Sequence, residues 1–161
     1  MNLTETILVL AVAIVVIAGV AVVFTDAREK NSQQKTMQAL LFMRSNIEQI
    51  FSNGDYSGIG NDILVTGKLV PAELLEGNNI RTNWGSVTVE EDDGGAGYAI
   101  TLDSLNSSAC QALATLSTTS WGRVEAGGTT LYDREENDPI NNVDLINACS
   151  ATTNSVTFVG P

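Results

Sequence analysis

The chain has 161 residues, of which 19 are acidic and 8 are basic, so its formal net charge is −11. Nucleic-acid-binding proteins rely on basic patches that release counterions from phosphates, so we expect no direct nucleic acid binding. The chain contains no His, which excludes Ser-His and Cys-His catalytic pairs and zinc motifs built on His. We therefore predict no enzymatic activity, no metal site and no cofactor.

An unbroken apolar run, residues 7–24, lies near the start of the chain, and one carboxylate, Glu5, stands before it. As a helix the run rises about 27 Å, close to the roughly 30 Å hydrocarbon thickness of a bilayer, so it can span a membrane. An acid at the head of such a run is costly unless it meets a positive partner. The nearest candidate is the α-amine of Met1, in the same helix or in a neighbouring copy of the chain. A pair between copies would favour a filament, so Glu5 and Met1 are candidate assembly residues.

Two other interpretations of this segment stay open. A secretory signal peptide is disfavoured, because residues 1–6 carry no Lys or Arg and the apolar run exceeds the usual length. A single-span membrane anchor accounts for the apolar run but gives no role to Glu5.

The helix is predicted to continue out of the apolar run. Residues 25–53 contain neither Pro nor Gly, and apolar side chains recur there at the spacing of one helical face: Met37, Leu40, Leu41, Ile47, Ile50 and Phe51. We therefore divide the chain into a long N-terminal helix, residues 1–53, and a globular head, residues 54–161. Residues 1–24 would form the transmembrane or filament-core half of the helix, and residues 25–53 an amphipathic half that packs against the head.

The first part of the head is predicted to hold a loop, a short helix and a hairpin. Residues 55–67 are rich in Gly, Asn and Ser, which indicates a loop, and residues 71–75 begin with Pro, which favours a first helical turn. Apolar residues alternate on both sides of an Asp-Asp-Gly-Gly turn, so residues 87–102 are predicted to form an antiparallel hairpin.

The second part of the head repeats these patterns. A helix over residues 107–116, capped by Ser107 or Ser108, is followed by a hairpin around Gly127 and Gly128. A helical turn is expected over residues 144–149 and a closing strand over residues 155–159. The predicted fold class is α+β, with an antiparallel sheet packed on the amphipathic half of the long helix.

These features together resemble the type IV pilin family, and the resemblance covers nearly the whole chain. It rests on Glu5 before the apolar run, the long helix, the β-rich head and two Cys that bracket the C-terminal region. Residues 83–89, 97–102 and 109–115 are similar to subunits of plasmid-encoded thin pili and enterobacterial bundle-type pili. Met1 in place of Phe at the first position, together with the size, resembles the type IVb branch.

The chain departs from the family pattern in two places. Many pilins carry Pro near position 22, where this chain has Val22, so Gly19 is the nearest candidate for a weak point in the helix. No leader ending in Gly precedes Met1, so the resemblance implies a form already cut by a prepilin peptidase, with N-methylation of the new amine expected.

Cys110 and Cys149 are the two cysteines of the chain. In an exported bacterial head domain, as the resemblance implies, such a pair is expected to form a disulfide that bounds residues 110–149. Closing a loop of about 40 residues would stabilise the fold by about 4 kcal/mol on the chain-entropy model. Two unlinked buried thiols remain the alternative.

Two acidic clusters, residues 90–93 and 133–138, contain several carboxylates that could bind a hard cation such as calcium. Their spacing fits no EF-hand, so we favour a solvated, charged surface.

The resemblance implies the major structural subunit of a type IVb pilus, a helical homopolymer built through the N-terminal helix. The subunit would lie in the inner membrane before assembly and in an extracellular pilus afterwards. Its expected partners are the prepilin peptidase and the pilus assembly machinery, with a host or recipient cell surface as a further candidate. Adhesion, aggregation or conjugative mating-pair stabilisation would be its use. A type II secretion pseudopilin or minor pilin, and a membrane-anchored periplasmic binding module that does not polymerise, are the alternatives.

Overall fold

The computed structural model describes residues 2–116 and 118–161, with the backbone alone described for residues 5–26. Helix α1, Leu3–Ile50, begins the chain. The chain divides within α1 into two compact units, Met1–Gln34 and Lys35–Pro161. The first unit is helical throughout its described residues from Leu3 onward, and the remainder of this section concerns the second.

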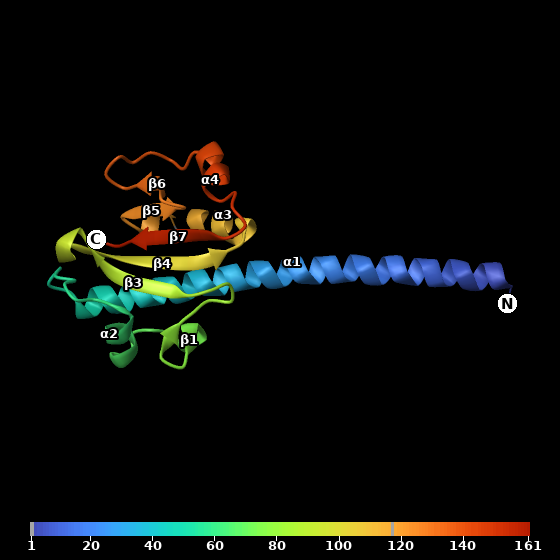
Figure 1. Ribbon diagram of the computed structural model, residues 1–161, viewed down its shortest axis with the longest axis horizontal. Coiled ribbons are helices and arrows are strands. Elements are labelled where there is room, and N and C mark those ends of the chain that lie inside the picture. The colour runs from blue at the N-terminus through green and yellow to red at the C-terminus, as the bar shows by residue number, and fades with distance from the viewer. Residues whose placement is uncertain (1, 117) are drawn as a thin grey trace. The chain divides into compact units, whose positions relative to one another are not determined.

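One five-stranded antiparallel sheet forms the centre of the second unit (Figure 1). The strand order is β3-β4-β7-β5-β6, with β3 at Val87–Asp92, β4 at Gly97–Leu105, β7 at Asn154–Val159, β5 at Arg123–Ala126 and β6 at Thr129–Asp133. Both predicted hairpins are therefore present, as β3-β4 and β5-β6. The closing strand β7 lies between them, where it pairs with β4 on one side and β5 on the other.

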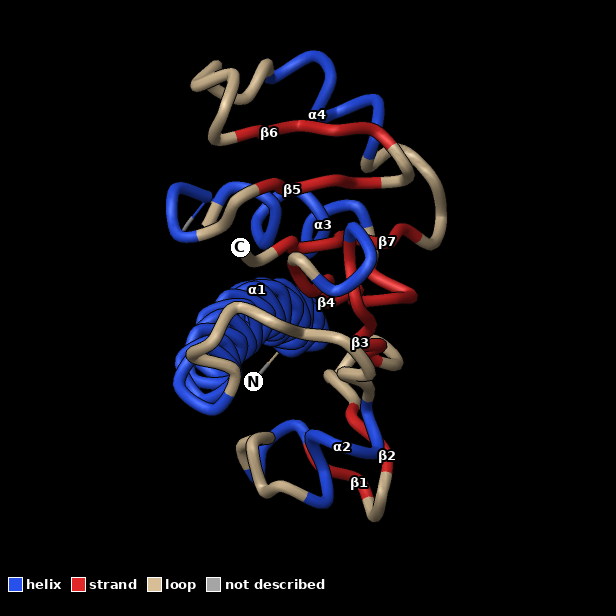
Figure 2. Tube along the Cα trace, turned by 90° about the vertical axis from the view of Figure 1, so that its left-hand side faces the viewer, coloured by secondary structure: helices blue, strands red, loops and turns tan. Residues whose placement is uncertain are grey.

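Shorter elements surround the sheet. They are α2 at Asn61–Thr66, the 3-10 turn η1 at Ala72–Leu74, β1 at Leu75–Glu76, β2 at Asn79–Ile80, η2 at Asp93–Gly95, α3 at Ser107–Thr115, η3 at Thr118–Ser120 and α4 at Asn142–Ala148. Figure 2 shows α4 beyond β6 at one edge and α2, β1 and β2 beyond β3 at the other.

Two predictions for these shorter elements were wrong in part. The predicted loop over residues 55–67 contains α2, whose buried Leu64 anchors it to the core despite the polar composition around it. Helix α3 is capped by Asn106 rather than by Ser107 or Ser108. The side-chain oxygen of Asn106 accepts a hydrogen bond from the backbone N–H of Ala109 at 2.7 Å, which satisfies a donor of the first turn.

The C-terminal part of α1 provides one wall of the core. Leu40, Met43 and Ile47 are fully buried and belong to the same hydrophobic cluster as residues of the sheet and of α3. The apolar face predicted from the sequence did not include Met43, which is buried. It did include Ile50, which is 63% exposed. The α+β prediction and the packing of the sheet on the amphipathic half of the helix are confirmed.

The helix ends three residues before the predicted boundary at residue 53. After Ile50 the chain forms a turn in which the N–H of Gly54 donates to the carbonyl of Phe51 at 2.9 Å. Gly54 has a φ of 76°, a conformation that glycine adopts without steric cost, so the Asn-Gly pair terminates the helix. Because the core uses α1 from Met37 onward, the compact unit begins at Lys35 rather than after the helix.

Candidate functional site

Of the two predicted assembly residues, Glu5 lies near the N-terminal end of α1. Backbone atoms of Glu5 and Gly19 belong to this helix. Their side-chain environments, and Met1 altogether, lie outside the described residues, so the pairing of Glu5 with a Met1 amine stays a prediction. Gly19 as a weak point of the helix likewise stays a prediction.

The predicted membrane-spanning half of the helix, residues 1–24, falls mainly within the same segment. Among the residues whose side chains are described, no helix is long and apolar enough to cross a membrane. The apolar run over residues 7–24 is outside that set.

Cys110 and Cys149 form the predicted disulfide. Their Cα atoms are 5.7 Å apart, and both residues are fully buried. Cys110 lies in α3, while Cys149 is the residue that follows α4, so the bond joins the two helices. The alternative of two unlinked thiols is thereby excluded.

A group of side chains joins α1 to the sheet, and no local pattern in the sequence predicts it. Arg44 and Glu48 are one turn apart on α1, and Nε of Arg44 lies 2.7 Å from Oε1 of Glu48. The hydroxyl of Tyr98, a fully buried residue of β4, donates to the same Oε1 at 3.2 Å. The Arg44 guanidinium also lies over the ring of Trp121, with its carbon 5.4 Å from the ring centroid. These four residues tie the helix both to β4 and to the disulfide-bounded region.

The electrostatics of this group follow from burial. Burial raises the pKa of the Tyr98 phenol well above its usual range, because a phenolate would lose its hydration. The Glu48 carboxylate raises this pKa further, while Arg44 opposes the effect. Tyr56, whose ring centroid is 5.0 Å from that of Tyr98, has its pKa raised by the same two causes, burial first. At neutral pH the phenols of Tyr56 and Tyr98 are therefore uncharged, while Arg44 and Glu48 on α1 form an ion pair.

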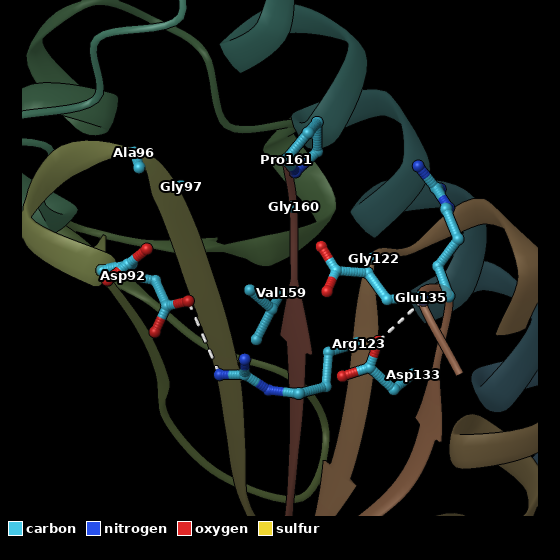
Figure 3. Close-up of a pocket in the computed structure, with 12 residues that line it drawn as sticks. Asp92, Ala96, Gly97, Gly122, Arg123, Asp133, Glu135, Val159, Gly160 and Pro161 are labelled. Atoms are coloured by element: carbon cyan, nitrogen blue, oxygen red, sulfur yellow. Dashed lines mark hydrogen bonds and ion pairs between the residues drawn. The ribbon is translucent and has the colours of Figure 1, made fainter. Parts of the chain in front are cut away.

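The two acidic clusters meet at one end of the sheet, around a hollow of about 450 Å³ (Figure 3). Arg123 lies in this hollow, with Nη2 3.5 Å from Oδ2 of Asp92 and Nε 2.7 Å from Oε1 of Glu125. Asp133 and Glu135 line the other side. In the described part of the chain, no three acidic or Cys side chains lie close enough together to hold a metal ion. Arg123 thus neutralises part of the charge that the fold brings together here.

Comparison with known protein families identifies the family. The family model described as PilS N terminal matches residues 28–160. The chain is 26% identical to the major structural subunit of bundle-forming pilus from Escherichia coli O111:H- and 27% identical to the subunit of the same name from Escherichia coli O127:H6. Each of these matches covers 98% of this chain and 92% of the relative.

Solved structures share the fold. TcpA, a type IV pilin from Vibrio cholerae El Tor biotype, superimposes with a TM-score of 0.63 at 14% identity, over 81% of this chain and 99% of that one. A type IV b pilin from Salmonella typhi gives a TM-score of 0.60 at 18% identity, over 76% and 95% of the two chains. The long helix, the antiparallel sheet and the disulfide agree with the fold of these pilins, and the chain belongs to the PilS N-terminal family.

Proposed function

We propose that this chain is the major subunit of a type IVb pilus, a structural protein rather than an enzyme. The observation that carries the proposal is the match to two major structural subunits of bundle-forming pilus along nearly the full length of both chains. A relationship over 98% of the chain includes both the N-terminal helix and the head, so it supports the same structural role for the whole molecule.

Polymerisation through the N-terminal helix follows from the sequence of that helix. A Glu5 carboxylate in an apolar filament core would need a positive partner, and the Met1 amine of a neighbouring copy supplies one. In this scheme the subunit is held in the inner membrane before assembly. A prepilin peptidase removes its leader, and the assembly machinery then adds the subunit to an extracellular filament. Gly19 would be the place where the helix loosens in the filament.

The use of the filament belongs to the same proposal. Adhesion, aggregation and conjugative mating-pair stabilisation all require an extended surface polymer, and the acidic head would form its outer face. A pseudopilin or minor pilin would share the fold but not the abundance of a major subunit. A membrane-anchored module would share the helix but not form filaments.

One experiment separates these functions. Surface filaments are sheared from cells that express the full chain, and their protein is weighed and identified by mass spectrometry. We expect this chain as the predominant protein, with Met1 at its N-terminus. Trace amounts in the filaments would favour the minor pilin or pseudopilin, and retention of all the protein in the membrane fraction would favour the anchored module. A mature terminus beyond residue 24 would refute the proposal.

A further inference from the structure

The turn that follows α1 contains the only Asn-Gly pair of the sequence, Asn53 and Gly54. Both residues are exposed. A Cβ placed on Gly54 would meet nothing within 4 Å, so the space around this residue is open to solvent. We call the two residues the Asn53-Gly54 pair.

An Asn that is followed by Gly is chemically weak for a geometric reason. The backbone nitrogen of the following residue can attack the side-chain amide carbon of Asn, because the bond between them closes a five-membered ring. A side chain on the following residue hinders this approach, whereas glycine has no Cβ and rotates freely into the required conformation. Gly54 is therefore the neighbour that protects the Asn53 amide least.

A backbone hydrogen bond favours the attack at Asn53. The N–H of Asp55 donates to Oδ1 of Asn53 at 3.3 Å. Negative charge develops on this oxygen when a nucleophile adds to the amide carbon, and a donor that is already in place stabilises the charge. The contact also folds the Asn53 side chain back over the Gly54 backbone, as in an Asx-turn.

Another hydrogen bond opposes the attack. The N–H of Gly54 donates to the carbonyl of Phe51 at 2.9 Å, and this bond must open before the nitrogen can react. It lies just beyond Ile50, the last residue of α1, where exposed backbone hydrogen bonds open at a lower free energy than those of a core strand. The bond therefore slows the reaction of the Asn53-Gly54 pair without preventing it.

Other Asn side chains are held more firmly by the fold. Asn61 donates to one backbone group of β3 and accepts from another, both at 2.7 Å. The Asn106 side chain caps α3, and Asn154 is 6% exposed and donates to the carbonyl of Leu105. Each of these amides must leave its partners before it can react, so the fold directs the reaction to Asn53.

We propose that Asn53 is a site of deamidation in the folded chain, through attack of the Gly54 nitrogen. The bond from this nitrogen to Cγ of Asn53 forms, and the bond from Cγ to Nδ2 breaks. The proton of the Gly54 N–H departs with Nδ2, so ammonia is released and a succinimide ring remains. Water then opens the ring at one of its two carbonyls, which leaves either Asp or isoaspartate at position 53. The net reaction consumes one water and releases one ammonia, so it needs no oxidant and no cofactor.

The modification changes the end of the long helix in two ways. It adds a negative charge to a chain whose formal net charge is already −11, near a helix C-terminus where the macrodipole disfavours an anion. The isoaspartate product also inserts one extra atom into the main chain after α1. Because the ammonia is lost to the solvent, the modified fraction grows with the age of the folded subunit. The reaction needs only water and the folded chain, so it does not depend on the proposed function.

Mass spectrometry of the full chain tests the proposal. The purified, folded protein is kept in detergent in water enriched in heavy oxygen, and samples are taken over days. Trypsin then releases residues 45–68 as one peptide, which holds Asn46, Asn53 and Asn61. The heavy oxygen marks deamidation that occurred before digestion, and fragmentation of the peptide locates it. We expect Asn53 to lose its amide at least about tenfold faster than Asn46 or Asn61, with both Asp and isoaspartate formed.

Two glycine variants separate the chemistry from backbone strain. Gly54→Ala should slow the loss at Asn53 by at least about tenfold, because the added methyl group hinders the attack. Gly58→Ala is the matched control, since Gly58 has a φ of 77° against 76° for Gly54, and a Cβ there also meets nothing within 4 Å. It introduces the same strain and should leave the rate at Asn53 unchanged. Asn53→Gln, which would need a larger ring, should show no loss at position 53 and serves if Gly54→Ala does not fold.

Three results would overturn the proposal. If Asn53 is stable in the folded chain but reacts in urea, the hydrogen bond from Gly54 to Phe51 protects the pair. If Asn46 and Asn61 react as fast as Asn53, the fold does not select the site. If Asp forms without isoaspartate, water hydrolyses the amide directly and Gly54 takes no part. The proposed function, which is tested on sheared filaments, would stand in all three cases.

Discussion

The hydroxyl of Tyr98 donates to Oε1 of Glu48 at 3.2 Å, which joins the central sheet to the amphipathic half of α1 through a partly buried polar contact. The same carboxylate oxygen is 2.7 Å from Nε of Arg44. One carboxylate thus satisfies a buried phenol and a helix cation together, and both depend on the register of the helix against the sheet.

Glu48→Ala should destabilise the folded chain by about 1–3 kcal/mol, because the buried Tyr98 hydroxyl loses its acceptor. Adding Tyr98→Phe to that variant removes the orphaned hydroxyl and should recover much of the loss. Urea unfolding of the full chain in detergent, followed by Trp fluorescence, gives the stability of the wild type, the two single variants and the double variant, which together form a double-mutant cycle. Strictly additive effects would show that the two residues do not interact.

Stability should fall at alkaline pH. The Tyr98 phenol has its pKa raised in the folded state, so its contribution is fully present below the unfolded value of about 10 and is lost as pH rises towards the folded value. Above about pH 10 the slope attributable to one such proton approaches 1.4 kcal/mol per pH unit. Unfolding of the wild type and of Tyr98→Phe is compared between about pH 8 and about pH 11. The variant should show the shallower decline, and parallel declines would contradict the assignment to Tyr98.

Gly160→Ala should destabilise the fold by about 1–3 kcal/mol through overpacking. A Cβ on Gly160 would overlap the ring of Tyr98, whose carbonyl accepts the N–H of Gly160 at 2.8 Å. Gly128→Ala is a useful comparison, because a Cβ there meets nothing within 4 Å and the penalty comes from its φ of 79° alone. Thermal unfolding of both variants separates packing from backbone strain. If the thermal unfolding midpoint of Gly160→Ala equals that of the wild type, the end of β7 can shift to make room for the added methyl group.

Cys110→Ser should lower the free energy of unfolding by about 2–5 kcal/mol, since the loop of about 40 residues is no longer closed in the unfolded chain. Reduced subunit levels and loss of filaments should follow. The variant is compared with Cys149→Ser and with Cys110→Ser/Cys149→Ser, which should match one another closely. Mass analysis of wild-type protein unfolded and alkylated without reductant should show no modified thiol.

Glu5→Val should leave the subunit in the membrane but stop assembly, because the Met1 amine of a neighbouring copy would remain unpaired at roughly 3–5 kcal/mol per subunit. Glu5→Asp keeps the charge and should retain part of the assembly. Filament counts by electron microscopy, with blots of the membrane fraction, distinguish assembly from expression. Wild-type filament numbers for Glu5→Val would leave the acid with no assembly role.

The local patterns of the sequence were enough to predict the long helix, both hairpins and the α+β class. Periodicity is a local property: apolar residues every three or four positions, or every second position, determine which face of a helix or strand is buried. Turn residues between the strands then limit which neighbours pair.

The tertiary structure alone decided what depends on contacts between distant residues. Residues 154–159 have the composition of a strand, but only the fold inserts β7 between two hairpins. Glu48 and Tyr98 are 50 residues apart, and nothing in either local pattern indicates their hydrogen bond. The burial of Met43 and the exposure of Ile50 were likewise decided by tertiary contacts. Both residues fit the pattern of an amphipathic helix, but the head packs over Met43 and leaves Ile50 exposed. Burial of a side chain depends on what packs against its face of the helix, and not on the period of the apolar residues alone.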